Sequence, residues 1–198
     1  MMHKKFQHHC DEVDSTNSEC CLSPTAIKLR DCFRLLWSQH VYWTRIVIMG
    51  IVYDLPDLPQ STNRLLRNAP DFGKLFCRFY GEKVGNEFCR LIKEHLVIAA
   101  ELVKAAKAGN SKAATVLEKK WYKNADEIVC FLNHINSCWS VECARAMWYK
   151  HLCLTKEEAI ALLTKNYSDS IKVFNKIEKE AMMMADDFAK SFIGQFNI

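Results

Sequence analysis

Apolar residues recur along most of the chain at alternating four- and three-residue steps, a spacing that places them on one side of an α-helix. The pattern predicts four long amphipathic helices, over residues of about 24–54, 82–108, 112–135 and 156–193. The stripe of the first helix consists of Leu29, Phe33, Leu36, His40, Trp43, Val47 and Gly50. No run of four or more alternating residues competes with this interpretation, so we expect an all-α protein.

Residues that favour helix ends set the boundaries of these stretches. Ser23 and Pro24 form an N-cap followed by proline at the first helical position. Thr155 and Glu158 match a capping box, which we expect to begin the longest helix. The link at 109–111 contains only Gly, Asn and Ser, so the second and third long helices must be antiparallel neighbours.

Two shorter helical segments connect the long helices. Residues 60–81 are expected to form two short helices, and residues 140–153 one more. Four long helices with two short helical connections are typical of a four-helix bundle, which we assign to residues 23–198. The stretch from residue 54 to residue 81 is long enough for a crossover, so the order of the helices around the bundle stays open.

Residues 1–22 differ from the rest of the chain because they contain almost no large apolar groups. Such a segment cannot bury enough surface to offset the entropy of ordering it, and we expect a polar tail. His3, His8, His9 and Cys10 are able to collect a transition metal there, although a solvated terminus is the simpler interpretation.

Composition points to a reducing compartment. The chain has ten cysteines but no Cys-x-x-Cys pair, and most of them lie in helical patterns, where free cysteine behaves as a small apolar residue. The N-terminus lacks an apolar leader, so we expect a cytoplasmic protein with free thiols. The longest apolar run, over 46–53, is too short to cross a membrane. The net charge of +4 permits an acidic partner without requiring one.

The sequence contains no recognisable catalytic motif. A phosphate-binding glycine loop, a nucleophile elbow, His-Glu-x-x-His and cysteine spacing for zinc are all absent. Lysines around the 109–111 turn form a weak candidate site for an anion or nucleic acid. They are Lys104, Lys107, Lys112, Lys119, Lys120 and Lys123. Acidic residues interrupt this set, so solvated helix faces are the simpler interpretation.

Histidines in the apolar stripes are the most informative feature. His40 and His95 each lie near the middle of a long helix, so we predict that they face each other inside the bundle. Histidines and carboxylates at mid-bundle are typical of metal sites, here for Fe, Zn or Mn. The candidate ligands are His40, His95, Glu94, Asp126, Glu127, His151 and Asp186, with Arg45 and Asn124 beside them. The alternative is a purely structural network in which His40, His95, Asn124 and Arg45 are tied to Asp126 or Glu127.

Several segments together resemble a family of small bacterial helical proteins, some of which carry the name acetylglutamate kinase. The matching segments are 37–45 (WSQHVYWTR), 94–99 (EHLVIA), 103–110 (VKAAKAGN), 124–127 (NADE), 150–152 (KHL) and 184–186 (MAD). The resemblance covers residues 28–197 and implies a helical fold without naming an activity. Related sequences often have an acid just before the first histidine, where this chain has Gln39. Nothing resembles the strand-rich sites of amino-acid kinases, and we do not expect a kinase.

Three functional hypotheses follow from the sequence. The first is a helical module that binds a partner or associates with itself, without an assigned reaction. The second is a metal-binding bundle centred on His40 and His95, an analogy with ferritin-like bundles at the level of the fold. The third is a weak anion or nucleic-acid binder that uses the 104–123 lysines.

Overall fold

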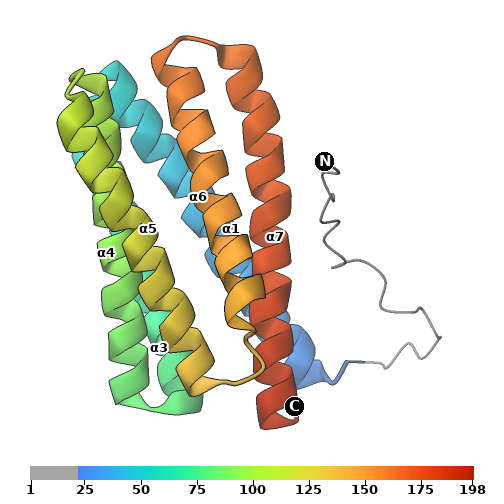
Figure 1. Ribbon diagram of the computed structural model, residues 1–198. Coiled ribbons are helices and arrows are strands. Elements are labelled where there is room, and N and C mark those ends of the chain that lie inside the picture. The colour runs from blue at the N-terminus through green and yellow to red at the C-terminus, as the bar shows by residue number, and fades with distance from the viewer. Residues whose placement is uncertain (1–21) are drawn as a thin grey trace, which may run out of the picture.

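The computed structural model describes residues 22–198 (Figure 1). Its helices are α1 (Pro24–Tyr53), α2 (Leu58–Leu66), α3 (Asn68–Tyr80), α4 (Glu82–Lys107), α5 (Ser111–Ile135), α6 (Val141–Leu163) and α7 (Tyr167–Phe196). The described part contains no strand, which confirms the all-α prediction. None of these helices combines the length and the apolarity that crossing a bilayer requires. Except for Leu22, the predicted tail lies outside the described residues, as do His3, His8, His9 and Cys10.

Several predicted helix ends are confirmed. The Ser23 hydroxyl accepts a hydrogen bond from the backbone N–H of Ala26 at 3.0 Å, and Pro24 begins α1. At the turn between α4 and α5, Gly109 has a positive φ of 69°. The Asn110 side chain caps α5 by accepting a hydrogen bond from the Ala113 N–H at 3.0 Å. Helices α4 and α5 consequently lie side by side and antiparallel, as the short link predicts (Figure 1).

The predicted helix over 156–193 is wrong at its start. Helix α6 continues through Thr155, whose hydroxyl donates to the His151 carbonyl at 2.9 Å and does not cap a helix. Glu158, the other half of the expected capping box, is buried and binds Arg45. The chain turns later, at Lys165 with its φ of 60°, and the Asn166 side chain caps α7.

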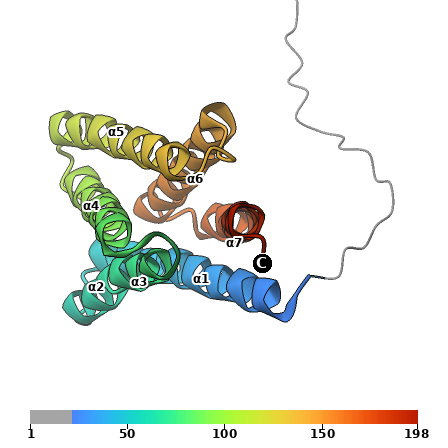
Figure 2. The same cartoon turned by 90° about the horizontal axis from the view of Figure 1, so that it is seen from below.

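This correction changes the count of long helices. With α6 and α7 separated by a turn, five helices of more than 20 residues are present in the described part, and the four-helix bundle is not confirmed. Helices α1, α4 and α6 run upward in Figure 1, whereas α3, α5 and α7 run downward. Seen along this direction, the helices surround a common interior (Figure 2).

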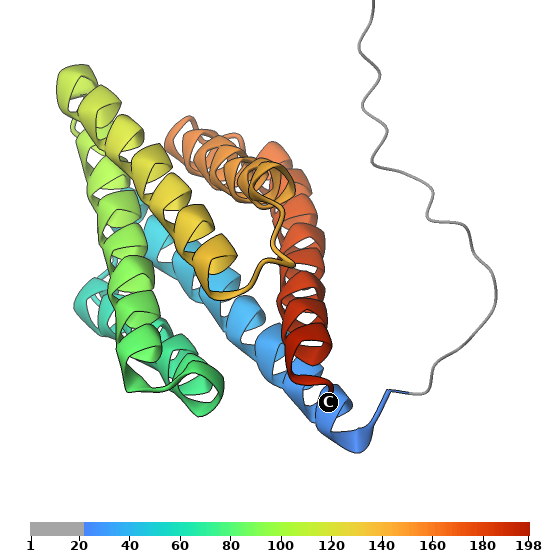
Figure 3. The same ribbon diagram turned by 60° about the horizontal axis from the view of Figure 1, so that its bottom comes forward.

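The lower half of that interior is filled with aromatic rings. Phe33, Phe76, Phe88, Phe188 and Phe192 are all fully buried. The rings of Phe76 and Phe88 stack at 3.8 Å between centroids, and Phe33 meets Phe192 edge-on at 5.0 Å. Because aromatic side chains bury large apolar areas, this cluster holds together the lower ends of the helices, where α1 and α4 begin and α7 ends (Figure 3).

Helices α3 and α4 approach each other closely at two glycines. A Cβ atom added at Gly85 would lie 2.6 Å from the Gly73 carbonyl oxygen and 2.7 Å from the Cys77 backbone nitrogen. Both neighbours are backbone atoms and cannot move aside cheaply. The contact therefore requires glycine at position 85.

Replacing Gly85 with alanine is expected to lower the free energy of unfolding by about 1–3 kcal/mol, because the helices must separate to accommodate the methyl group. Gly194→Ala is the matched control, since nothing lies within 4 Å of its Cβ position in α7. Alanine there should be neutral or stabilising by up to about 1 kcal/mol. Urea unfolding followed by circular dichroism measures both. Equal stability of the two variants would contradict the close packing.

Candidate metal centre

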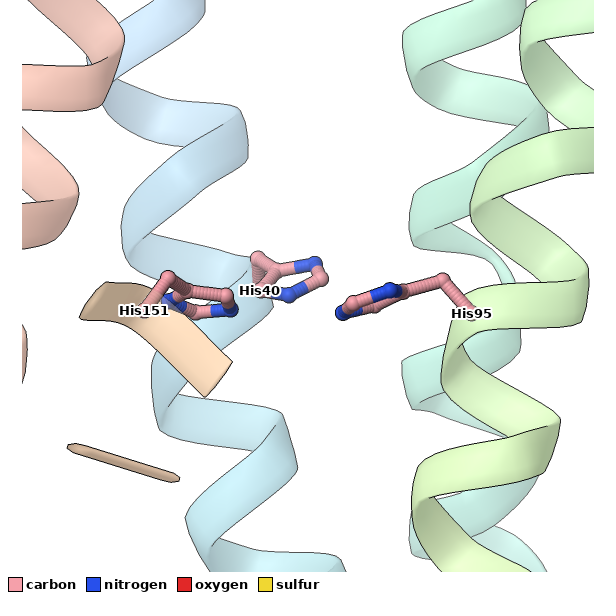
Figure 4. A group of neighbouring side chains, drawn as sticks. All are labelled: His40, His95 and His151. Atoms are coloured by element: carbon pink, nitrogen blue, oxygen red, sulfur yellow. The ribbon is translucent and has the colours of Figure 1, made fainter. Parts of the chain in front are cut away.

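Three histidines from three helices meet at the centre of the protein. His40 of α1, His95 of α4 and His151 of α6 are each at most 2% exposed. Their ring centroids are 5.4 to 6.1 Å apart, and one ligand atom of each ring lies within 4.8 Å of the others (Figure 4). The prediction that His40 and His95 face each other is confirmed. The third member of the group is His151.

Each ring is held by a polar side chain from a helix that runs in the opposite direction. His40 Nδ1 lies 3.0 Å from Asn68 Oδ1, and His95 Nδ1 lies 3.0 Å from Asn124 Oδ1. His151 Nδ1 lies 3.3 Å from Glu180 Oε2. Asn68, Asn124 and Glu180 are themselves buried. The hydrogen bonds that the described residues make to these rings thus all use Nδ1.

The surroundings of the two asparagines determine which ring nitrogen carries the proton. The amide nitrogen of Asn68 donates to the Leu36 carbonyl at 2.9 Å, and that of Asn124 donates to the Leu91 carbonyl at 3.2 Å. With the NH₂ group engaged in this way, only the amide oxygen faces the imidazole, and it is solely an acceptor. His40 and His95 must therefore donate from Nδ1–H.

The Nδ1 atom of His151 likewise faces an acceptor, because a carboxylate oxygen such as Glu180 Oε2 accepts a hydrogen bond from Nδ1–H. In a neutral imidazole with Nδ1 protonated, Nε2 carries a lone pair. In this neutral form each ring offers the Nε2 lone pair on the side away from its Nδ1 partner, and one ligand atom of each ring lies within 4.8 Å of the others. This arrangement is typical of metal-ligating histidines, whose second nitrogen donates to a carboxylate or a carbonyl.

The three histidines and their partners follow one spacing along the chain. The histidines are 55 and 56 residues apart, and each partner follows its histidine by 28 or 29 residues. The residue after each partner is a fully buried alanine. They are Ala69, Ala125 and Ala181. The chain therefore supplies the centre from three similar units, with glutamate replacing asparagine in the third.

Indole rings pack around the centre. The Trp37 ring lies 5.2 Å from His40, and the Trp148 ring lies 5.4 Å from His95. Trp121 packs on the His95 ring at 5.3 Å. Burial, together with the neighbouring His151, lowers the pKa of His40 to about 3. Burial also holds the pKa of His95 well below its usual value, so both rings are neutral at physiological pH.

The carboxylates proposed from the sequence lie elsewhere. Glu94 pairs with Arg90, Asp126 with Arg145, Glu127 with Lys123 and Asp186 with Arg34, all on partly exposed faces. Asn124 is brought to the centre as the partner of His95. Arg45 instead binds Glu158 and reaches Ser170 at 3.4 Å. Of the residues proposed from the sequence, the structure brings four to the centre, namely His40, His95, His151 and Asn124. Two further residues lie there that the apolar stripes did not indicate, Asn68 and Glu180.

Buried neutral histidines make the stability of the metal-free protein depend on pH. The pKa of His40 is about 3 when folded and near 6.5 when unfolded, so between these values the unfolded chain binds more protons. Burial of the neutral His40 ring therefore leaves the free energy of unfolding at its full value above pH 6.5, and this free energy falls progressively as the pH falls toward 3. The unfolded chain binds at most one proton more at His40 than the folded chain does. His40→Leu should therefore reduce the slope of the unfolding free energy against pH by up to about 1.4 kcal/mol per pH unit.

The check compares urea unfolding of the parent chain and of His40→Leu between pH 7 and pH 4, with chelator present. His134→Leu is the control, because His134 is exposed on α5. The difference between the parent and His40→Leu should change with pH, and the difference for the control should not. Parallel pH profiles for the parent and His40→Leu would contradict burial of a neutral ring.

No family model, no curated protein and no solved structure matches this chain. What the centre does is therefore inferred from its own chemistry.

Proposed function

We propose that the protein binds one divalent transition-metal ion through His40, His95 and His151. The observation that carries the proposal is the convergence of three buried imidazoles whose Nδ1 atoms are all engaged outward. Three lone pairs directed at one another in an apolar interior are electrostatically unfavourable. A cation between them turns the same arrangement into a favourable one.

The dimensions support an ion of this kind after a small adjustment. Zinc–nitrogen bonds measure about 2.0–2.1 Å, and the ligand atoms lie within 4.8 Å of one another. Each nitrogen then moves inward by less than about 1 Å to reach bonding distance. Imidazole ligands favour Zn²⁺, Fe²⁺, Ni²⁺ or copper, whereas Mn²⁺ and Mg²⁺ prefer oxygen. The nitrogen-only set therefore favours zinc or iron over manganese.

Glu180 supplies a negative charge beside the centre. It is 3% exposed, its Oε2 accepts from His151, and its Oε1 has no hydrogen-bond partner among the described residues. A buried carboxylate with an unused oxygen is costly unless a nearby positive charge compensates it. A dication at the three histidines provides that charge, and the carboxylate in turn makes the His151 ring a stronger ligand.

Three protein ligands leave at least one coordination position open. Structural zinc sites usually have four protein ligands, whereas catalytic sites have three and leave a position for water or substrate. When bound, such an ion supplies a Lewis acid or lowers the pKa of a coordinated water. The chain's own contribution is to orient the three rings and to keep bulk water away.

The other functional hypotheses remain predictions. Partner binding or self-association has no specific support in the described residues. Three of the turn lysines are paired with acids, namely Lys104 with Glu101, Lys107 with Asp54 and Lys123 with Glu127. These pairs favour the solvated-face interpretation of the 104–123 lysines over anion binding.

The metal proposal predicts one Zn²⁺ or Fe²⁺ ion per chain, measured by elemental analysis of protein purified without a histidine tag and by calorimetric titration of metal-free protein. His40→Ala, His95→Ala and His151→Ala should each weaken binding by about a hundredfold or more, because each removes one of the three metal–nitrogen bonds. His134→Ala should bind as the parent does, since His134 is exposed and outside the centre.

A second control removes the contribution of the N-terminal histidines. The titration is repeated on a chain carrying His3→Ala, His8→Ala and His9→Ala. Stoichiometry and affinity should be unchanged if the ion binds at the centre. A metal-free parent chain that takes up no added ion would contradict the proposal and leave a structural polar network.

Glu180→Gln is expected to weaken metal binding by about 10- to 100-fold, the usual cost of changing a group that orients a ligand. Glutamine keeps an acceptor for His151 but removes the charge. Glu157→Gln is matched in chemistry but lies on the exposed side of α6, so its affinity should equal that of the parent. Isothermal titration measures all three. Equal affinities for the parent and Glu180→Gln would show that the buried charge of Glu180 does not strengthen metal binding.

A further inference from the structure

A cavity of about 160 Å³ lies on one side of the three histidines. Its lining includes Thr44, Ala99 and Thr155, each of which follows its histidine by four residues. Residues four apart on a helix lie one above the other on the same face. Because α1, α4 and α6 all run upward in Figure 1, these three lining residues lie one helical turn above the histidines in that orientation.

The opposite side of the histidines is closed. The residues three positions before them are Trp37, Ile92 and Trp148, and all are fully buried. Beyond these lie the stacked phenylalanines of the lower core. A molecule that reaches the histidines therefore arrives from the cavity side, where Ala106 on the lining is exposed at the end of α4.

The size of the cavity limits what it holds. An apolar cavity of about 150 Å³ in another protein binds benzene, so this space suits a molecule of about six heavy atoms. Most of the lining is aliphatic, from residues such as Val47, Leu96, Val103 and Ala159. The charged residues on the lining, Lys156 and Glu118, pair with each other at 2.6 Å. The lining therefore suits a neutral ligand and not an ion.

Two of the lining residues carry a buried polar group that has no partner among the described residues. They are Thr44, through its hydroxyl, and Trp121, through its indole N–H. By contrast, the Thr155 hydroxyl is already bonded to the His151 carbonyl. A buried donor without a partner costs about 1–3 kcal/mol, which a ligand atom that accepts a hydrogen bond would recover.

From these observations we infer that the cavity binds a small, neutral, mostly apolar molecule with a single hydrogen-bond acceptor, such as the oxygen of a short ketone, aldehyde or alcohol. The acceptor lies toward Thr44 and Trp121, and the hydrocarbon part fills the aliphatic space. Occupancy of the cavity does not require a metal. Contact between the ligand oxygen and an ion at the histidines rests on the proposed function.

The test uses cyclohexanone as the probe and the metal-free full-length chain. Titration followed by NMR should show saturable binding that shifts the indole N–H resonance of Trp121, assigned with Trp121→Phe. Ala99→Leu fills the cavity and should weaken binding at least tenfold while leaving zinc affinity within about threefold of the parent. Absence of saturable binding to the parent, or equal binding by Ala99→Leu, would overturn the inference.

Thr44→Val is a second variant whose result does not depend on whether Ala99→Leu folds. Valine keeps the shape of the threonine side chain and removes only its hydroxyl. This variant should weaken binding of cyclohexanone but not of cyclohexane. Equal loss for both probes would overturn the role assigned to Thr44. In Co²⁺-loaded protein, cyclohexanone should also change the visible spectrum. If metal never binds but cyclohexanone does, the proposed function fails and the cavity inference stands.

Discussion

The hydrogen bond from each buried imidazole to a side chain on an antiparallel helix is the interaction on which the centre of the structure depends. An unpaired buried polar group costs about 1–3 kcal/mol, and three rings stand side by side in an apolar interior. Asn68, Asn124 and Glu180 meet this demand at Nδ1. In doing so they fix the height of α3 against α1, of α5 against α4 and of α7 against α6. The register of each helix pair and the tautomer of each ring are thus set by the same contact.

Much of the helical architecture could be predicted from the sequence, because apolar stripes and capping residues act locally. His40 and His95 stood out because each interrupts an apolar stripe at mid-helix, and Asn124 was among the residues expected beside them. The start of the last helix was mispredicted for a tertiary reason. Thr155 and Glu158 have the spacing of a cap, but the first bonds a carbonyl one turn earlier and the second binds Arg45 on another helix.

The remaining parts of the centre depend on a long-range regularity that stripes do not reveal. Asn68 begins a short helix and Glu180 lies among charged residues, so neither attracts notice locally. The signal lies in the spacing of the histidines by 55 and 56 residues and in the alanine after each partner. The tautomers of His40 and His95 depend on the Leu36 and Leu91 carbonyls, because these carbonyls orient the amides of Asn68 and Asn124. Backbone contacts of this kind cannot be inferred from residue identity.

The difference between the two ends of the interior has a consequence for motion. The aromatic end is densely packed, so exchange of any small molecule with the centre depends on the opposite end, where the α4–α5 turn and the α6–α7 turn lie. Helix ends fluctuate on nanosecond to microsecond timescales, far faster than a packed core opens. Gly109 and Lys165, both with positive φ, lie at these turns, away from the residues that bind the histidines. If a small molecule enters the cavity as inferred above, substitutions at these turns are expected to change the rate of its entry more than its affinity.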